Sequence, residues 1–181
     1  KGLYFFLMDY GRDKNFLASP ARSIFVDGEI ALMIAARQMV RLKEEYRSVL
    51  RERIASLTAQ MKAGPVLCGE SYPDECWIFC NTIALAAMRI SDILENEDHQ
   101  PFFQDWITTA KGNLLQQPLG LLISSFLLNG TPGDGPEGTS IWLAAHCLQI
   151  IDEEFAIDQY WRARKELMKT FLGFGYAGEW P

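Results

Sequence analysis

One pattern, repeated three times along the chain, most constrains its fold: a loop carrying an acidic residue, then an apolar helix, then an amphipathic helix. The segments DGEIALMIAA (27–36), DECWIFCNTIALAA (74–87) and PEGTSIWLAAH (136–146) align on this pattern. A helix that is apolar all round is buried, whereas an amphipathic helix turns its polar face to solvent. Alternating the two therefore predicts an inner layer of apolar helices covered by an outer layer of amphipathic ones.

The hydrophobic periodicity predicts where the individual helices lie. Residues 28–62 are either one long helix or two, and we favour two joined near residue 43, where the apolar face changes width. Asp27 and Asp74 stand where helix N-caps belong, and Pro101 suits a first helical turn. The further predicted elements are helices at 75–94, 102–115, 139–151 and 152–172, a helix end at 1–8, an undecided helix or strand at 118–130, and a C-terminal loop from 173.

Three such helical hairpins are about half of the six that close an α/α toroid. The predicted fold class is therefore all-α, an incomplete (α/α)6 toroid forming a single partial domain over residues 1–181. The open edge left by three hairpins, and the start at Lys1 rather than at a methionine, favour a fragment of a longer chain.

Charge, hydropathy and cysteine content exclude several other classes. The formal net charge of −6 argues against a nucleic-acid partner. The sequence contains no run of 18 apolar residues, so it predicts no membrane span. The localisation is then cytoplasmic by default, unless upstream targeting signals have been lost. Cys68, Cys76, Cys80 and Cys147 are too sparse for a disulfide framework. The two histidines lack zinc-ligand spacing, so we expect free thiols and no metal.

The candidate site follows from the repeat. Loops that precede inner helices collect on one rim of a toroid, where the helix N-termini favour carboxylates or an anionic ligand. Six acidic residues are expected to form an acidic mouth there: Asp27, Glu29, Asp74, Glu75, Asp134 and Glu137. Four aromatic residues are expected to wall it: Phe25, Tyr72, Trp77 and Trp142. This combination suits a neutral hydroxylated or isoprenoid-like small molecule.

Each of these residues also has a purely structural explanation. The first acids of each loop can be helix caps, and Glu75 and Glu137 can be ordinary first-turn acids. Cys80 can be a small buried thiol and Trp142 a core residue. Glu29 can simply interact favourably with the helix dipole. Against that explanation, an acid that begins an apolar inner helix must face either the rim or a cavity.

Three segments together resemble a known family. SIFVDGEIALMIAAR (23–37), SYPDECWIFCNT (71–82) and GPEGTSIWLAAH (135–146) are similar to the toroid domain of linalool dehydratase-isomerase and its relatives. The resemblance covers most of the chain, and the block around 72–81 is its most specific part. It implies an α/α toroid with a cofactor-free cavity for small alcohols. It also implies acid–base removal or migration of a hydroxyl group, in a homo-oligomer whose sites take residues from a neighbouring subunit.

The resemblance transfers residue by residue only in part. Cys80 and Asn81 match the family's cysteine–asparagine pair, whereas Ser71 stands where the family has a second cysteine. Glu29 stands where the family has a histidine. A carboxyl group in an apolar cavity has a raised pKa, which suits proton exchange near neutrality.

Three functional hypotheses follow. The first is a lyase or isomerase of small apolar alcohols, with Glu29, Cys80 and Tyr72 as catalytic residues. Its substrate-binding residues are Phe25, Asp27, Ser71, Asp74, Glu75, Trp77, Asn81, Glu137 and Trp142. The second is a carbohydrate-active toroid, a glycosidase or sugar epimerase, which needs two carboxyl groups facing each other and exposed tryptophans. The third is a non-catalytic helical scaffold with a filled centre.

Overall fold

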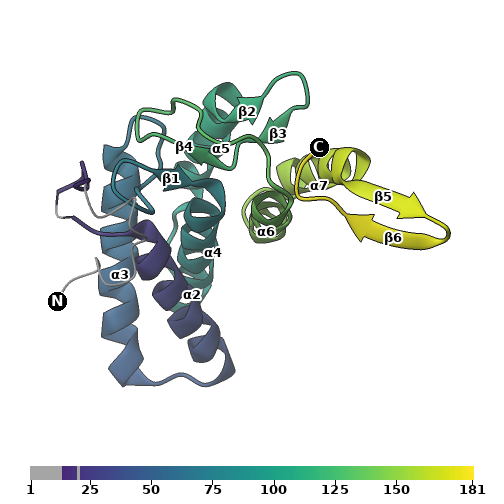
Figure 1. Cartoon of the computed structure of the whole chain (residues 1–181). Coiled ribbons are helices and arrows are strands. Elements are labelled where there is room, and N and C mark those ends of the chain that lie inside the picture. The colour runs from purple at the N-terminus through teal and green to yellow at the C-terminus, as the bar shows by residue number, and fades with distance from the viewer. Residues whose placement is uncertain (1–13, 20) are drawn as a thin grey trace.

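The computed structural model describes residues 14–19 and 21–181, so the helix end expected at 1–8 lies outside the described residues (Figure 1). Within them the chain forms six helices and three small two-stranded sheets. The prediction of a mostly helical protein is confirmed at this level. A toroid is not shown by the described part of the chain.

The first hairpin consists of α2 (Ile24–Val40) and α3 (Glu44–Ala63), so the predicted break near residue 43 is confirmed. The side chain of Gln38 makes the turn between them by bonding both the backbone N–H and the carbonyl of Lys43, at 2.8 and 3.0 Å. Helix α3 is amphipathic and buries one stripe, made up of Leu50, Ile54, Leu57 and Met61.

The second hairpin consists of α4 (Ile78–Glu95) and α5 (Gln100–Asn113), the latter with Pro101 in its first turn as predicted. Helix α4 is almost wholly buried along its first eleven residues. It ends at Asn96, whose left-handed backbone (φ 55°) turns the chain toward α5.

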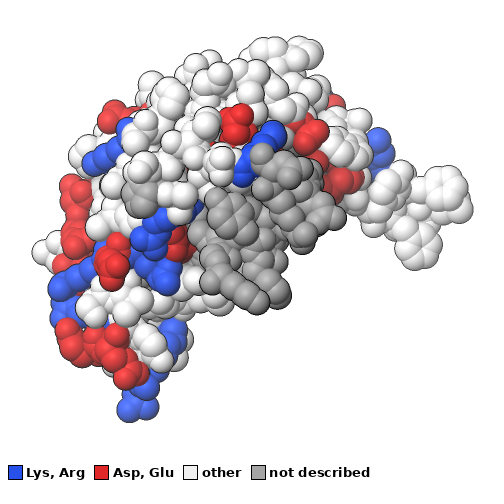
Figure 2. Space-filling view, turned by 60° about the vertical axis from the view of Figure 1, so that its left-hand side comes forward, with Lys and Arg blue, Asp and Glu red and all other residues white. Residues whose placement is uncertain are grey.

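The third hairpin consists of α6 (Gly138–Leu148) and α7 (Glu153–Leu167). Asp152 caps α7 by accepting the Phe155 backbone N–H at 2.8 Å. The helix expected to continue to 172 instead stops at Leu167. The C-terminal stretch, predicted as a loop, forms a ribbon of β5 (Met168–Phe171) and β6 (Phe174–Ala177). The ribbon projects from the body of the protein, and its far end carries no charged side chain (Figures 1 and 2).

Two further short sheets involve residues 118–130, the segment whose sequence fits either a helix or a strand. β1 (Cys76–Trp77) pairs antiparallel with β4 (Ser125–Phe126), and β2 (Leu115–Gln116) pairs with β3 (Leu121–Leu122). Residues 118–130 therefore contain two short strands flanked by turns, and no helix. The β1–β4 pair joins the start of α4 to the loop before α6.

The apolar helices of the repeat lie next to one another, because α4 packs against α2 on one side and α6 on the other. Helices α3 and α7 cover α2 and α6. One core cluster runs through all three hairpins, including the fully buried Trp106 and Phe103 of α5. Some apolar side chains of these inner helices are exposed, among them Met33 of α2 at 62% and Ile93 of α4 at 68%.

Two predicted helix starts are wrong. Ser23, not Asp27, caps α2, with its hydroxyl accepting the Val26 N–H at 3.4 Å. Asp74 does not cap α4, because it sits in a turn at φ 54° and the helix begins only after Trp77. A polar residue before an apolar run usually indicates a helix cap. Here α2 already begins before Asp27, with Ile24, whereas the residues that follow Asp74 include the strand β1.

Candidate functional site

Glu29 lies on the second turn of α2, near Cys80 in the first turn of α4. The two helices lie close together here, since a methyl group at the preceding Gly28 would make ordinary van der Waals contact, at 3.6 Å, with Ala84 and with the Cys80 carbonyl oxygen. The half-buried carboxylate of Glu29 is close enough to two thiols for its charge to act on them, those of Cys80 in α4 and Cys147 in α6. Among residues 14–19 and 21–181, no side chain forms a hydrogen bond or ion pair with it. Within the described part of the chain, Glu29 is thus a carboxylate without a hydrogen-bond or ion-pair partner.

Cys80 is a buried neutral thiol beside this carboxylate. Burial raises its pKa to about 12, and the nearby negative charge of Glu29 adds to the effect, while a hydrogen bond with Ser71 partly offsets it. Ser71 also accepts the Trp77 backbone N–H at 3.1 Å, so its hydroxyl is held in place. The structure therefore brings Ser71 and Cys80 together. These are the two positions at which the family that the chain resembles has cysteines. A thiol with so high a pKa is protonated at neutral pH and is not a nucleophile.

A row of aromatic rings lies between the loop before α4 and the starts of α2 and α4. Ring centroids are 6.1 Å apart for Phe25 and Tyr72, 6.2 Å for Phe25 and Phe79, and 5.9 Å for Trp77 and Phe79. Phe79 links the row and was missed from the sequence, although its place directly before Cys80 is a usable signal. Trp142 is not part of this row, because its ring packs edge-on against Tyr160 of α7 at 5.8 Å.

The acidic residues converge only in part. Asp74, Glu75 and Asp134 line one cavity of about 460 Å³ together with Trp77. Glu137 lines another of about 360 Å³, whose wall includes Trp77 and Phe79. The pKa of Glu137 is raised by partial burial and by the charges of Asp134 and Glu179. Trp77 belongs to both cavities, so these four acids share one region near the β1–β4 pair.

Several predicted site residues are already engaged in structural contacts. The carboxylate of Asp27 is buried and accepts hydrogen bonds from Arg22 and Arg53. The amide of Asn81 bonds both backbone groups of Gly69 and the Trp77 carbonyl, at 2.8 to 3.2 Å. Glu75 accepts the Trp77 indole N–H. Asp27 and Asn81 therefore stabilise the fold, whereas the carboxylates of Glu29 and Asp74 have no such contact with the residues that the structure describes.

Glu70 is a buried acid that the sequence analysis overlooked. Its two carboxylate oxygens accept the backbone N–H groups of Leu17, Ala18 and Asp74, at 2.7 to 2.9 Å. It joins the segment before α2 to the loop before α4. In the sequence, only its position between Gly69 and Ser71, in a loop rich in turn residues, could have indicated a role for this acid.

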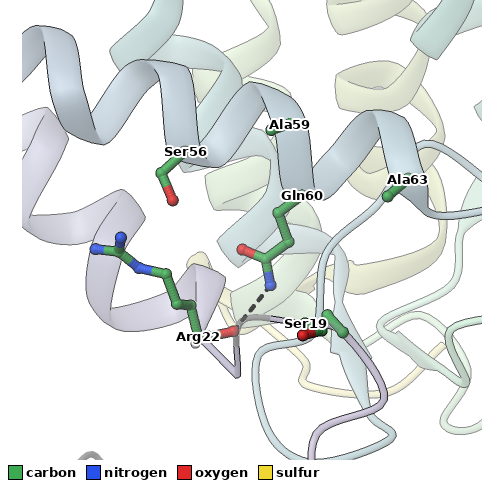
Figure 3. Close-up of a pocket in the computed structure, with 7 residues that line it drawn as sticks. Ser19, Arg22, Ser56, Ala59, Gln60 and Ala63 are labelled. Carbon is green, nitrogen blue, oxygen red and sulfur yellow. Dashed lines mark hydrogen bonds between the residues drawn. The ribbon is translucent and has the colours of Figure 1, made fainter.

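A small cavity of about 160 Å³ lies on the outer side, between the segment before α2 and α3 (Figure 3). Gln60 spans it by donating to the Arg22 carbonyl at 2.8 Å. Its remaining walls are mainly alanine and serine, and none of the predicted site residues lines it.

Comparison with known proteins adds no family. No protein-family model matches the chain, and no curated protein is significantly similar to it. None of the helices in the described residues is long and apolar enough to span a membrane.

Proposed function

We propose that the protein is a lyase or isomerase that removes or moves the hydroxyl group of a small, fairly apolar alcohol by acid–base chemistry at Glu29. The observation that carries the proposal is the half-buried carboxylate of Glu29, which has no partner among the described residues and lies on the face shared by α2, α4 and α6. Leaving a carboxylate unpaired near apolar side chains costs stability, and such a cost is typical of functional positions.

In the proposed fold, α2, α4 and α6 are three consecutive inner helices of an α/α toroid, and their uncovered face looks into its cavity. Exposed apolar side chains on two of these helices support this arrangement, namely Met33 of α2 and Leu143 of α6. Large apolar patches that are exposed to water often mark binding surfaces. Such a lining would select apolar substrates over sugars.

The chemistry needs one proton donor and one proton acceptor, and a single carboxyl group can supply both in turn. Glu29 in its protonated form gives its proton to the substrate hydroxyl, so that the C–O bond breaks and water leaves. The resulting carboxylate then takes a proton from the neighbouring carbon, whose C–H electrons form the double bond. The rings of Phe25, Phe79 and Trp77 favour the positive charge that develops between these steps. Tyr72 and the neutral thiol of Cys80 orient the hydroxyl group.

The test is turnover of a panel of small tertiary and allylic alcohols by the full-length protein, with the alkene product measured by gas chromatography. Glu29→Gln should lower kcat by about 100-fold or more, the usual contribution of a general acid–base group. Tyr72→Phe should give a smaller loss, and Glu52→Gln on the exposed side of α3 should give none. Full activity in Glu29→Gln would refute the proposal.

A carbohydrate-active toroid is the second candidate, and a separate observation favours it. Asp74, Glu75 and Asp134 line one cavity beside the indole of Trp77, a combination that suits a sugar ring. Asp74→Asn and Asp134→Asn should then abolish hydrolysis of aryl glycosides, while Glu29→Gln leaves it unchanged. Loss of alcohol turnover in Glu29→Gln with no glycosidase activity would decide for the first candidate.

A further inference from the structure

A second cluster of chemically active side chains lies away from Glu29, at the turn between α4 and α5. His99 immediately precedes α5, and Asp92 lies in the last turn of α4. Glu97 lies between the two helices. Each of these three residues offers one possible ligand atom, and the three atoms lie within 4.8 Å of one another. All three come from eight consecutive residues, so the turn itself builds the cluster.

Asp92 fixes the imidazole of His99. Its buried carboxylate contacts the ring Nδ1 at 2.5 Å and accepts the backbone N–H of the same residue at 3.0 Å. A carboxylate at this distance holds the proton on Nδ1, which leaves the Nε2 lone pair free to act as an acceptor. Histidines that bind metals typically donate their other ring N–H to a carboxylate in this way.

The Nε2 side of His99 faces a cavity of about 350 Å³ between the turn and α3. Glu97 lines the same cavity, and the Thr58 hydroxyl lies 3.5 Å from Nε2. A nitrogen ligand and an exposed carboxylate therefore meet at a space that is open to water and large enough for a hydrated ion.

The cationic side chains beside this cavity are engaged elsewhere. Arg51 pairs with Glu95, and the Lys62 ammonium lies 5.5 Å from the centroid of the Phe102 ring. With Arg51 neutralised by Glu95, the two carboxylates of Asp92 and Glu97 outweigh the single charge of Lys62, which leaves a net negative charge that attracts a cation.

We infer that this turn binds a divalent cation of the zinc type, with His99 Nε2 and Glu97 as ligands, Asp92 as the group that orients the imidazole, and water in the remaining positions. A mixed nitrogen and oxygen set suits Zn²⁺, Co²⁺ or Ni²⁺, whereas Mg²⁺ and Ca²⁺ prefer oxygen alone. The bound ion holds the α4–α5 turn and stabilises the hairpin, because it binds the folded chain alone.

The test is titration of the full chain with ZnCl₂ by calorimetry, repeated with CoCl₂ to record the visible spectrum. One equivalent should bind, with a cobalt spectrum that lacks the thiolate charge-transfer band expected if the cysteines were the ligands. Glu97→Gln and His99→Gln should each weaken binding about tenfold or more, and Asp92→Asn should weaken it similarly through the ring orientation. MgCl₂ should give no binding.

The matched controls are Asp98→Asn, the exposed acid next to Glu97, and His146→Gln, the chain's other histidine, which should both bind Zn²⁺ as the unmodified chain does. The Glu97 side chain is exposed and forms no hydrogen bond or ion pair with the described residues, so its variant remains informative even if His99→Gln unfolds. Absence of zinc binding, or binding that survives Glu97→Gln unchanged, would overturn the inference.

Discussion

Asp27 and Glu29 lie two residues apart on α2, yet the structure predicts opposite consequences of neutralising them. The Asp27 side chain is only 10% exposed, and its oxygens contact Arg22 Nε at 2.7 Å, Arg22 Nη2 at 3.2 Å and Arg53 Nη1 at 2.5 Å. In Asp27→Asn one oxygen becomes an NH₂ group, which faces a guanidinium as donor against donor. At least one arginine contact is lost and the charge attraction disappears.

The magnitude follows from the burial of the three side chains. A hydrogen bond to a charged group contributes about 1.5–3 kcal/mol, and breaking a fully buried ion pair costs roughly 3–5 kcal/mol. Arg22 and Arg53 are 33% and 25% exposed, so water replaces part of what is lost. We therefore expect Asp27→Asn to lower the free energy of unfolding by about 2 kcal/mol.

Urea unfolding followed by far-UV circular dichroism measures this loss, and Glu29→Gln is the matched control. Because Glu29 has no partner among the described residues, its neutral variant should be as stable as the unmodified chain or slightly more stable. A loss below about 0.5 kcal/mol in Asp27→Asn would refute the assignment of Asp27 as a structural ion pair. A large loss in Glu29→Gln would show that this carboxylate is needed for folding instead.

Three further changes test other contacts. Burial alone would raise the pKa of Glu95, but hydrogen bonds and charges from Arg47 and Arg51 outweigh it and lower that pKa. The stabilisation is therefore present above the ordinary value of 4.5 and lost as the pH falls through the folded value, so the stability deficit of Glu95→Gln in urea should shrink in acid. Asn81→Ala should cost about 2–3 kcal/mol in the same assay, because it leaves buried backbone groups without partners. Gly130→Ala should lower the thermal midpoint, since the residue has φ 88° and a methyl group there would stand 2.7 Å from a valine methyl.

The helical hairpins were predictable because their periodicity is long and strong. The break between α2 and α3 could be placed near residue 43 because the composition changes there from apolar to charged. The β5–β6 ribbon is not predicted, because residues up to 172 continue the pattern of an amphipathic helix and the glycine-rich stretch from 173 is typical of a loop. Its turn uses positive φ at Leu172 and Gly173, and only the glycine signals that in the sequence.

The candidate site was predictable in its residues more than in their roles. The aligned acids of the repeat identified both Asp27 and Glu29, but only the structure shows that α3 supplies an arginine to the first and none to the second. Such partners come from residues 26 positions away, beyond the reach of local pattern. Cys80 and Ser71 were paired only through the family resemblance.

Glu70 couples two loops to each other, the segment before α2 and the loop before α4. Its carboxylate accepts N–H groups from Leu17 and Ala18 on one side and from Asp74 on the other. Opening either loop leaves a buried charge with fewer donors, which makes opening of the other less costly. The amide protons of these three residues should therefore exchange with solvent as one cooperative unit, separate from the helices they adjoin.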